Sequence, residues 1–289
     1  MITLRPYQNT LLQQVRAKFA THKRVIMQLP TGGGKTKLFV TMALQSLVKG
    51  RTVLILTESA KIYRGIKEEI KQVIEINPDS KIKTIVRNLP FLAMAQTLAR
   101  RKHLIEQFAA KGSELLVIVD ECHIGTPTKI LEQFTDAYLL GVTATPHFKW
   151  AKHLPELYEV CVTGLQVNEL IEVHKALTPY KHVIKKEVDT NGLEIGSNGE
   201  FTEQSQERIF DRLNAHELLA EDLRNRNWHK GMIFCASIKS ANSLYEYLCS
   251  QGFDCIVEHS KKGSDLERFE KGTANLCISV GSMTKGYDF

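Results

Sequence analysis

Three features are scarce or missing in this 289-residue sequence, and each absence excludes a class of protein. None of the six cysteines stands in a CxxC pair, so a zinc site has little support. Most of them lie in apolar runs, as expected of buried free thiols in a reducing compartment. No apolar stretch approaches the ~20 residues that span a bilayer, and residues 1–6 lack the apolar core of a signal peptide. We therefore expect a cytoplasmic protein that does not enter a membrane, with a nuclear location left open.

A strong charge of either sign is also missing. The 38 lysines and arginines exceed the 32 acidic residues by only a formal +6, which permits contact with a polyanion but does not establish it. Hydrophobic residues make up 43% of the chain, enough for one large or two modest domains with their own cores. The function therefore has to be inferred from motifs and not from the charge.

The first half of the chain alternates short apolar runs with helical stretches. Strands are expected at residues 25–29, 52–56, 81–86, 115–119 and 137–142. Helices are expected at residues 6–19, 35–49 and 59–76. Near-continuous apolar strands separated by helices predict an α/β fold, in which a parallel sheet is covered on both faces.

A second α/β pattern follows a less regular stretch after Pro146. In that stretch we expect a strand at 180–188, an exposed loop at 189–199 and a helix at 204–226. The second pattern comprises strands at 231–235, 254–258 and 275–280 and a helix at 240–250. We therefore expect two domains, residues 1–165 and 166–289, with no internal repeat.

A glycine-rich loop, Pro-Thr-Gly-Gly-Gly-Lys-Thr at residues 30–36, lies between the first strand and its helix. Glycines let the backbone curl so that several N–H groups point at one phosphate, and the helix N-terminus adds to the field. Lys35 can reach the β- and γ-phosphates, and the Thr36 hydroxyl can coordinate Mg²⁺. The general pattern begins with Gly, where this chain has Leu29, and a plain tight turn is the alternative. The predicted phosphate-binding residues are Thr31, Gly32, Gly33, Gly34, Lys35 and Thr36.

An acidic pair, Asp120-Glu121, follows the apolar strand at 115–119. Strands of a parallel sheet deliver the residues that follow them to the ligand-binding edge. We expect Asp120 to hold Mg²⁺ and Glu121 to orient and deprotonate the attacking water. With Lys35, these are the predicted catalytic residues. A solvated acidic turn is the alternative, which the upstream phosphate loop makes less favourable.

Taken together, Gly-Lys-Thr, Asp-Glu-Cys-His at 120–123 and Thr-Ala-Thr-Pro at 143–146 resemble motifs I, II and III of superfamily 2 helicases. The resemblance is to the branch that contains the DEAH-type and restriction-enzyme motors, and it implies tandem RecA-like domains. It also implies that the cofactors are ATP and Mg²⁺. By the same resemblance His123, Thr143 and Thr145 couple the nucleotide site to the nucleic acid.

The resemblance extends to weaker segments. Leu-Arg-Pro-Tyr-Gln at 4–8 resembles the adenine-recognition element, which implies that Gln8 contacts adenine with help from Arg5. A segment near residues 95–101 is similar to motif Ib, and residues 233–237 and 279–289 are similar to motifs IV and V. The residues that would then contact nucleic acid are Gln96, Thr97, Arg100, Ser237 and Thr284, and Asp288 would approach the ATP ribose.

The sequence stops after motif V, and we interpret the second domain as incomplete at its C-terminus. The arginine-rich motif VI would then come from a missing segment or from a partner chain. Because its arginine contributes about 10³–10⁵ in rate in related enzymes, we expect the isolated 289-residue chain to bind ATP–Mg²⁺ but to be a poor motor.

The partner implied is nucleic acid, with DNA favoured over RNA, and the function implied is ATP-dependent helicase activity. Three alternatives stay open at this point. One is a double-strand DNA translocase or remodeller that does not unwind. Another is a nucleic-acid-binding module gated by ATP, without motor activity. The third is a P-loop protein unrelated to nucleic acid, which leaves the second α/β pattern unexplained.

Overall fold

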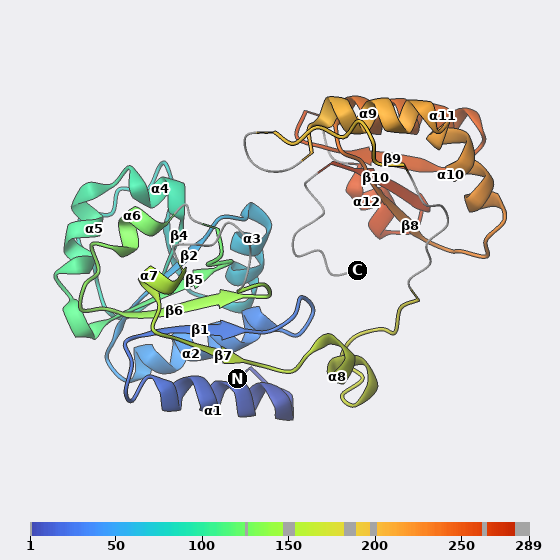
Figure 1. Cartoon of the computed structure of the whole chain (residues 1–289). Helices are drawn as coiled ribbons and strands as arrows, with labels where there is room; N and C mark the ends of the chain where they lie inside the picture. Colours follow the sequence, from blue (N-terminus) through green and yellow to red (C-terminus); the bar gives the residue numbers. More distant parts are fainter. Residues whose placement is uncertain are drawn as a thin grey trace. The chain divides into compact units, whose positions relative to one another are not determined.

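The chain divides into two compact units, Met1–Tyr180 and Lys181–Phe289, in a computed structural model (Figure 1). The structure describes residues 2–124, 127–146, 154–181, 189–196, 201–261 and 265–280. Helix α8 (Val167–Glu172) places Leu170 in the core of the first unit, and Leu177 packs beside it. This packing is why the division in the structure falls later than the boundary expected between residues 165 and 166.

The first unit is built on a seven-stranded sheet in which all neighbouring strands are parallel. In spatial order the strands are β3 (Ile74–Ile76), β4 (Phe91–Met94), β2 (Thr52–Thr57), β5 (Leu115–Asp120), β6 (Tyr138–Thr143), β1 (Arg24–Gln28) and β7 (Val160–Thr163). Strands β2 and β5 are buried at every residue, because helices cover both faces of the sheet. The predicted α/β fold with a parallel sheet is confirmed.

Two layers of helices cover this sheet. One core lies under α1 (Pro6–Lys18), α2 (Lys35–Val48), α3 (Ala60–Glu69) and α8. The other lies under α4 (Ala95–Ala99), α5 (Lys102–Ala109), α6 (Thr128–Leu131) and α7 (Leu154–Leu157). Alternate residues of β1 serve the two cores: Ile26 belongs to the second, whereas Val25 and Met27 belong to the first.

Two predicted elements in this unit were wrong. The apolar run at 81–86 is not a strand: Ile85 is buried against α5, and the Gln107 side chain holds the backbone by accepting from the Ile85 N–H and donating to the Lys83 carbonyl. The sheet position is taken by β4, a short strand that the sequence analysis did not identify. The helix expected over 59–76 ends at Glu69, and its last part forms β3, which pairs with β4.

The second unit contains a three-stranded parallel sheet in the order β8 (Gly231–Phe234), β10 (Leu276–Ser279) and β9 (Cys255–Glu258). Helices α10 (Ala215–Arg224) and α11 (Ile238–Ser250) share one core with it, and α12 (Leu266–Glu270) shares the other. The helix expected over 204–226 is two helices, α9 (Glu203–Arg212) and α10, because Asn214 adopts a left-handed conformation with φ 47°.

The strand expected at 180–188 falls mostly on residues 182–188, which lie outside the described residues. The same holds for Thr284 and Asp288 of the predicted motif V. Across the described ranges, none of the helices has the length and the apolar character needed to cross a membrane.

Candidate nucleotide and nucleic-acid site

The glycine-rich loop connects the carboxyl end of β1 to the first residue of α2. Gly32 and Gly34 have φ angles of 78° and 87°, which side chains other than glycine rarely adopt. Gly34 is the N-cap of α2, so Lys35 and Thr36 are the first two residues of the helix. The free N–H groups of this helix end and the half-buried Lys35 therefore stand at the same edge of the sheet.

Helix α1 is tied directly to this loop. The Tyr7 hydroxyl and the Gln8 Nε2 each donate to the Gly33 carbonyl at 3.0 Å. The Gln8 Oε1 accepts from the backbone N–H of Arg5 at 2.8 Å. A Cβ on Gly34 would stand 2.2 Å from the Gln8 Nε2, so glycine is required for this close approach. Gln8 thus lies against the phosphate loop, and its contact with adenine stays a prediction.

A second contact with the loop comes from residues that the sequence analysis missed. Lys175, with φ 49°, turns the chain after α8, and the neighbouring His174 ring lies 5.1 Å from the Tyr7 ring. A Cβ on Gly32 would stand 2.6 Å from the Leu177 Cδ2. No motif or periodicity signals this contact, because it joins segments far apart in the sequence.

The first member of the acidic pair ends strand β5 and is deeply buried. Asp120 is only 3% exposed, and its Oδ2 accepts from the Thr57 hydroxyl at 3.4 Å. Burial raises the pKa of Asp120 to about 7, and the nearby Glu121 carboxylate adds to the rise. Lys35 acts in the opposite direction and lowers that pKa, which places the phosphate-loop ammonium within electrostatic reach of Asp120.

The two segments meet because of the strand order. Strand β6 lies between β1 and β5, so the ends of β1 and β5 are two strand spacings apart, roughly 10 Å. A triphosphate can bridge a gap of this size. The predicted catalytic residues therefore stand around one space at the carboxyl edge of the sheet.

The predicted coupling residues are joined through one hydroxyl. The Thr143 Oγ1 accepts from the Thr145 N–H at 3.0 Å and lies 2.9 Å from the His123 Nδ1. The same His123 nitrogen is 3.2 Å from the Glu121 Oε2. Glu121 itself has φ 49°, an unfavourable conformation for a residue with a side chain. Motifs II and III are therefore in direct contact, and strain is concentrated at the acidic pair.

The donor set fits a magnesium ion that is also held by phosphate. A cation beside Asp120 would offset the cost of a buried carboxylate next to Glu121. Thr36 adds a hydroxyl at the first turn of α2. Within the ranges that the structure describes, no group of three His, Cys, Asp or Glu side chains could hold a metal by itself. Mg²⁺ typically binds one or two carboxylates plus substrate phosphates, and Asp120 and Thr36 would supply the protein ligands.

The predicted nucleic-acid contacts of motif Ib lie on and just after α4. Gln96 and Arg100 are exposed, and Thr97 is half-buried. The neighbouring Arg101 has a different role, since its guanidinium donates to the carbonyls of residues 77, 78 and 80 at 2.6–2.9 Å. Arg100, and not Arg101, is therefore the arginine available to a phosphate.

Ser237 is 4% exposed and caps α11, where its hydroxyl accepts from the Ser240 N–H at 3.1 Å. The same hydroxyl donates to the Glu207 carboxylate at 2.5 Å. The side chain is thus engaged in the local structure of the second unit. Its predicted contact with nucleic acid remains a prediction.

Comparison with known proteins places this site in a family context. The model of the family described as "Type III restriction enzyme, res subunit" matches residues 1–148. The chain is 23% identical over 271 residues to a 51.5 kDa protein of a Lactococcus phage. It is 22% identical over 292 residues to the ATP-dependent RNA helicase SUB2 of Yarrowia lipolytica. These two alignments each cover 91% of this chain, but only 56% and 61% of the relatives.

The fold is also similar to that of a solved helicase. The structure of Dbp5 of S. cerevisiae bound to RNA and ADP BeF3 matches with a TM-score of 0.58 and 18% identity. The match covers 99% of this chain and 76% of Dbp5. It supports the tandem RecA-like fold. The family match and the helicase relatives confirm the resemblance to superfamily 2 helicases inferred from motifs I to III. The chain spans less than two thirds of the length of the curated relatives.

Proposed function

Because the chain belongs to the family of the type III restriction enzyme res subunit, within the superfamily 2 helicases, we propose that it couples ATP hydrolysis to movement along nucleic acid or to its unwinding. The single observation that carries the proposal is the strand order, which brings the phosphate loop after β1 and Asp120 at the end of β5 to the same carboxyl edge, two strand spacings apart. A phosphate loop and an acidic strand end on one edge form the arrangement that phosphoryl transfer requires.

In this proposal, different residues bind the phosphates, hold the metal ion and accept the proton of the attacking water. The N–H groups of Gly32 and of residues 34–36, with the Lys35 ammonium, bind the β- and γ-phosphates and offset their charge. Asp120 and Thr36 would hold Mg²⁺, which would supply positive charge to offset the charge of the phosphates. Glu121, strained and within 3.2 Å of His123, accepts the proton of the attacking water.

Thr143 links the nucleotide site to the segment that follows β6. Its hydroxyl contacts His123 and the Thr145 backbone together, so a shift of Glu121 on hydrolysis would move the segment that follows β6. The exposed residues Gln96, Thr97 and Arg100 are the proposed contacts with the nucleic-acid backbone in this unit.

The proposed substrate is nucleic acid. One comparison favours DNA and two favour RNA. The family is named for a restriction enzyme, which favours DNA, the nucleic acid expected from the sequence. SUB2 is named an RNA helicase, and Dbp5 was solved with RNA, which favours RNA as the second candidate. Translocation along duplex DNA without strand separation is the alternative mode of action.

The test is ATP hydrolysis by the purified chain with Mg²⁺, measured without nucleic acid and with single- and double-stranded DNA and RNA. We expect nucleotide binding in every case and, in line with the slow hydrolysis expected of this 289-residue chain, weak but measurable stimulation by one type of nucleic acid. Lys35→Ala should abolish the stimulated rate, whereas Lys37→Ala, an exposed lysine on the same helix turn, should not. Strand-separation and triplex-displacement assays then distinguish unwinding from translocation. Failure to bind ATP at millimolar concentration would overturn the proposal.

A further inference from the structure

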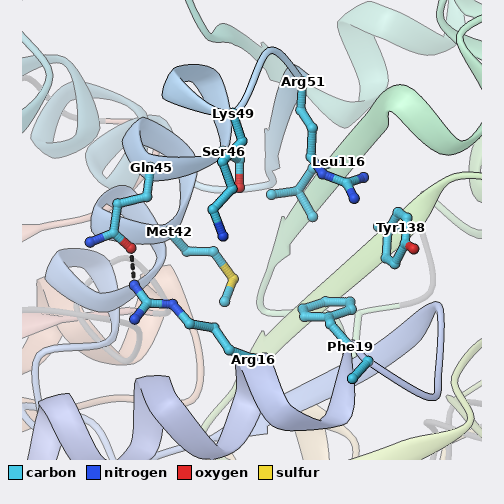
Figure 2. A pocket seen from close by; sticks show the side chains of 10 residues that line it. Arg16, Phe19, Met42, Gln45, Ser46, Lys49, Arg51, Leu116 and Tyr138 are labelled. Atoms are coloured by element: carbon cyan, nitrogen blue, oxygen red, sulfur yellow. Dashed lines mark hydrogen bonds between the residues drawn. The ribbon is translucent and has the colours of Figure 1, made fainter.

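A cavity lies at the opposite edge of the first sheet, away from the phosphate loop. It has a volume of about 280 Å³ and is bounded by the last turns of α1 and α2 and by the first residues of β5 and β6 (Figure 2). Leu116 lines it near the beginning of β5, and Asp120 ends the same strand. At about 3.3 Å per residue, the two edges are therefore separated by roughly 13 Å along β5.

Positive charge is concentrated around this cavity. The cavity is lined by Arg16 of α1, by Lys49 directly after α2 and by Arg51 directly before β2, and its lining contains no aspartate or glutamate. Arg16 and Lys49 are exposed, and Arg16 donates to the Gln45 side chain at one side of the cavity (Figure 2). An occupant that carries negative charge is therefore favoured.

One wall of the cavity is aromatic and fixed. The Arg51 guanidinium lies 4.2 Å above the centre of the Tyr138 ring and donates to the Ser113 carbonyl at 2.7 Å. The Phe19 ring stands edge-on to the Tyr138 ring at 5.7 Å, and Figure 2 shows these three groups following one another along one side. The half-buried Phe19 and Tyr138 rings offer apolar surface below a rim of cations, and the buried Met42 and Leu116 lie behind it.

We propose that this cavity binds an acidic peptide segment of a protein partner, with one apolar side chain inserted and the flanking carboxylates paired with Arg16, Lys49 and Arg51. The volume admits a single apolar side chain. The cations surround one hollow, whereas a nucleic-acid backbone requires positive charge spread along a groove. The proposal does not depend on ATP hydrolysis, because the cavity shares no side chain with the nucleotide site.

The test uses three acetylated, amidated peptides on the full chain: Asp-Asp-Phe-Asp-Asp, the same peptide with Ser in place of Phe, and Lys-Lys-Phe-Lys-Lys. Binding is measured by NMR titration and by calorimetry at low and high salt. We expect binding of the first peptide alone, weakened by salt. The double variant Arg16→Glu, Lys49→Glu should weaken it about tenfold or more, since two rim charges are reversed.

The matched control for the single variant Arg16→Glu is Lys18→Glu, because each reverses one exposed cation in the last turn of α1 and only Arg16 lines the cavity. If Lys18→Glu weakens binding of the Phe peptide as much as Arg16→Glu does, the cations act only through the general charge of the helix end, and the proposal is overturned. Equal binding of the Ser peptide, or displacement of the Phe peptide by oligonucleotides, would also overturn it. Thermal unfolding of each variant checks that the fold is retained.

Discussion

The two edges of the seven-stranded sheet are built from the same strands and helices, yet they differ in almost every physical respect. At the carboxyl edge, Asp120 is buried, Glu121 is strained, and Thr143 joins two motifs. At the amino edge, Arg16 and Lys49 are exposed around an open cavity. In a parallel sheet all strands point the same way, so one edge collects the residues that follow strands and the other the residues that precede them.

The difference shows where a fold of this type concentrates unfavourable conformations and charges. Positive φ angles occur at both edges, but at the amino edge they belong to glycines such as Gly50, whereas at the carboxyl edge Glu121 adopts one despite its side chain, and the pKa of a buried carboxyl is raised there. Such features persist only where the surrounding structure enforces them, and they cluster at functional sites. The amino edge uses ordinary helix ends and surface charges, so substitutions there should have small effects on catalysis.

The largest expected effect comes from the two ends of β5. Glu121→Gln should lower nucleic-acid-stimulated ATP hydrolysis by about 10²–10⁴, the contribution typical of a positioned general base, while ATP binding is retained. The matched variant is Glu114→Gln, just before the same strand, where the carboxylate pairs with Arg87 on the surface. It should change the rate less than about twofold, because exposed ion pairs contribute little. Loss of ATP binding in Glu121→Gln would contradict the proposed role.

The two ends of α2 give the next comparison. Gly34→Ala places a Cβ 2.2 Å from Gln8 in a left-handed conformation, so we expect about 2–4 kcal/mol of lost stability and weaker ATP binding. Gly50→Ala has a similar φ of 78° but no atom within 4 Å, and it should cost only about 1 kcal/mol. Urea unfolding and nucleotide titration of both variants measure the difference. Equal losses would mean that the contact between Gln8 and the loop is unimportant.

These pairs also show how far the sequence alone could predict the molecule. The phosphate loop and the acidic pair were found because their residue types and their places after strands are set by local chemistry. The contact between Leu177 and Gly32 could not be predicted, because it depends on the path by which the chain after α8 reaches the phosphate loop. Likewise, the run at 81–86 has strand-like residues, but the Gln107 side chain engages its backbone instead. Contacts between residues far apart in the sequence therefore determine these two features, and local sequence patterns do not reveal such contacts.

The raised pKa of Asp120 at the carboxyl edge makes the stability of the protein depend on pH. Because the pKa of Asp120 rises from 3.8 to about 7 on folding, the unfolded chain releases this proton first as the pH increases. The free energy of unfolding should therefore fall between about pH 4 and pH 7 in protein without nucleotide. Asp120→Asn removes the cost of ionising a buried carboxyl. At pH 8 this variant should therefore unfold at a temperature about 5 °C or more above that of the wild type. A lower unfolding temperature at pH 8 would contradict the raised pKa.

The smallest effect is expected for the adjacent arginines after α4. Arg100→Ala should weaken nucleic-acid binding a few-fold and lower the slope of log K against log salt by about one, as for the loss of one phosphate contact. Arg101→Ala should instead destabilise the first unit by about 1–3 kcal/mol, because three carbonyls of residues 77–80 lose their donor. Its salt slope should be unchanged. If Arg101→Ala alters the slope and Arg100→Ala does not, the phosphate contact belongs to Arg101, and the local structure at 77–80 must rearrange when nucleic acid binds.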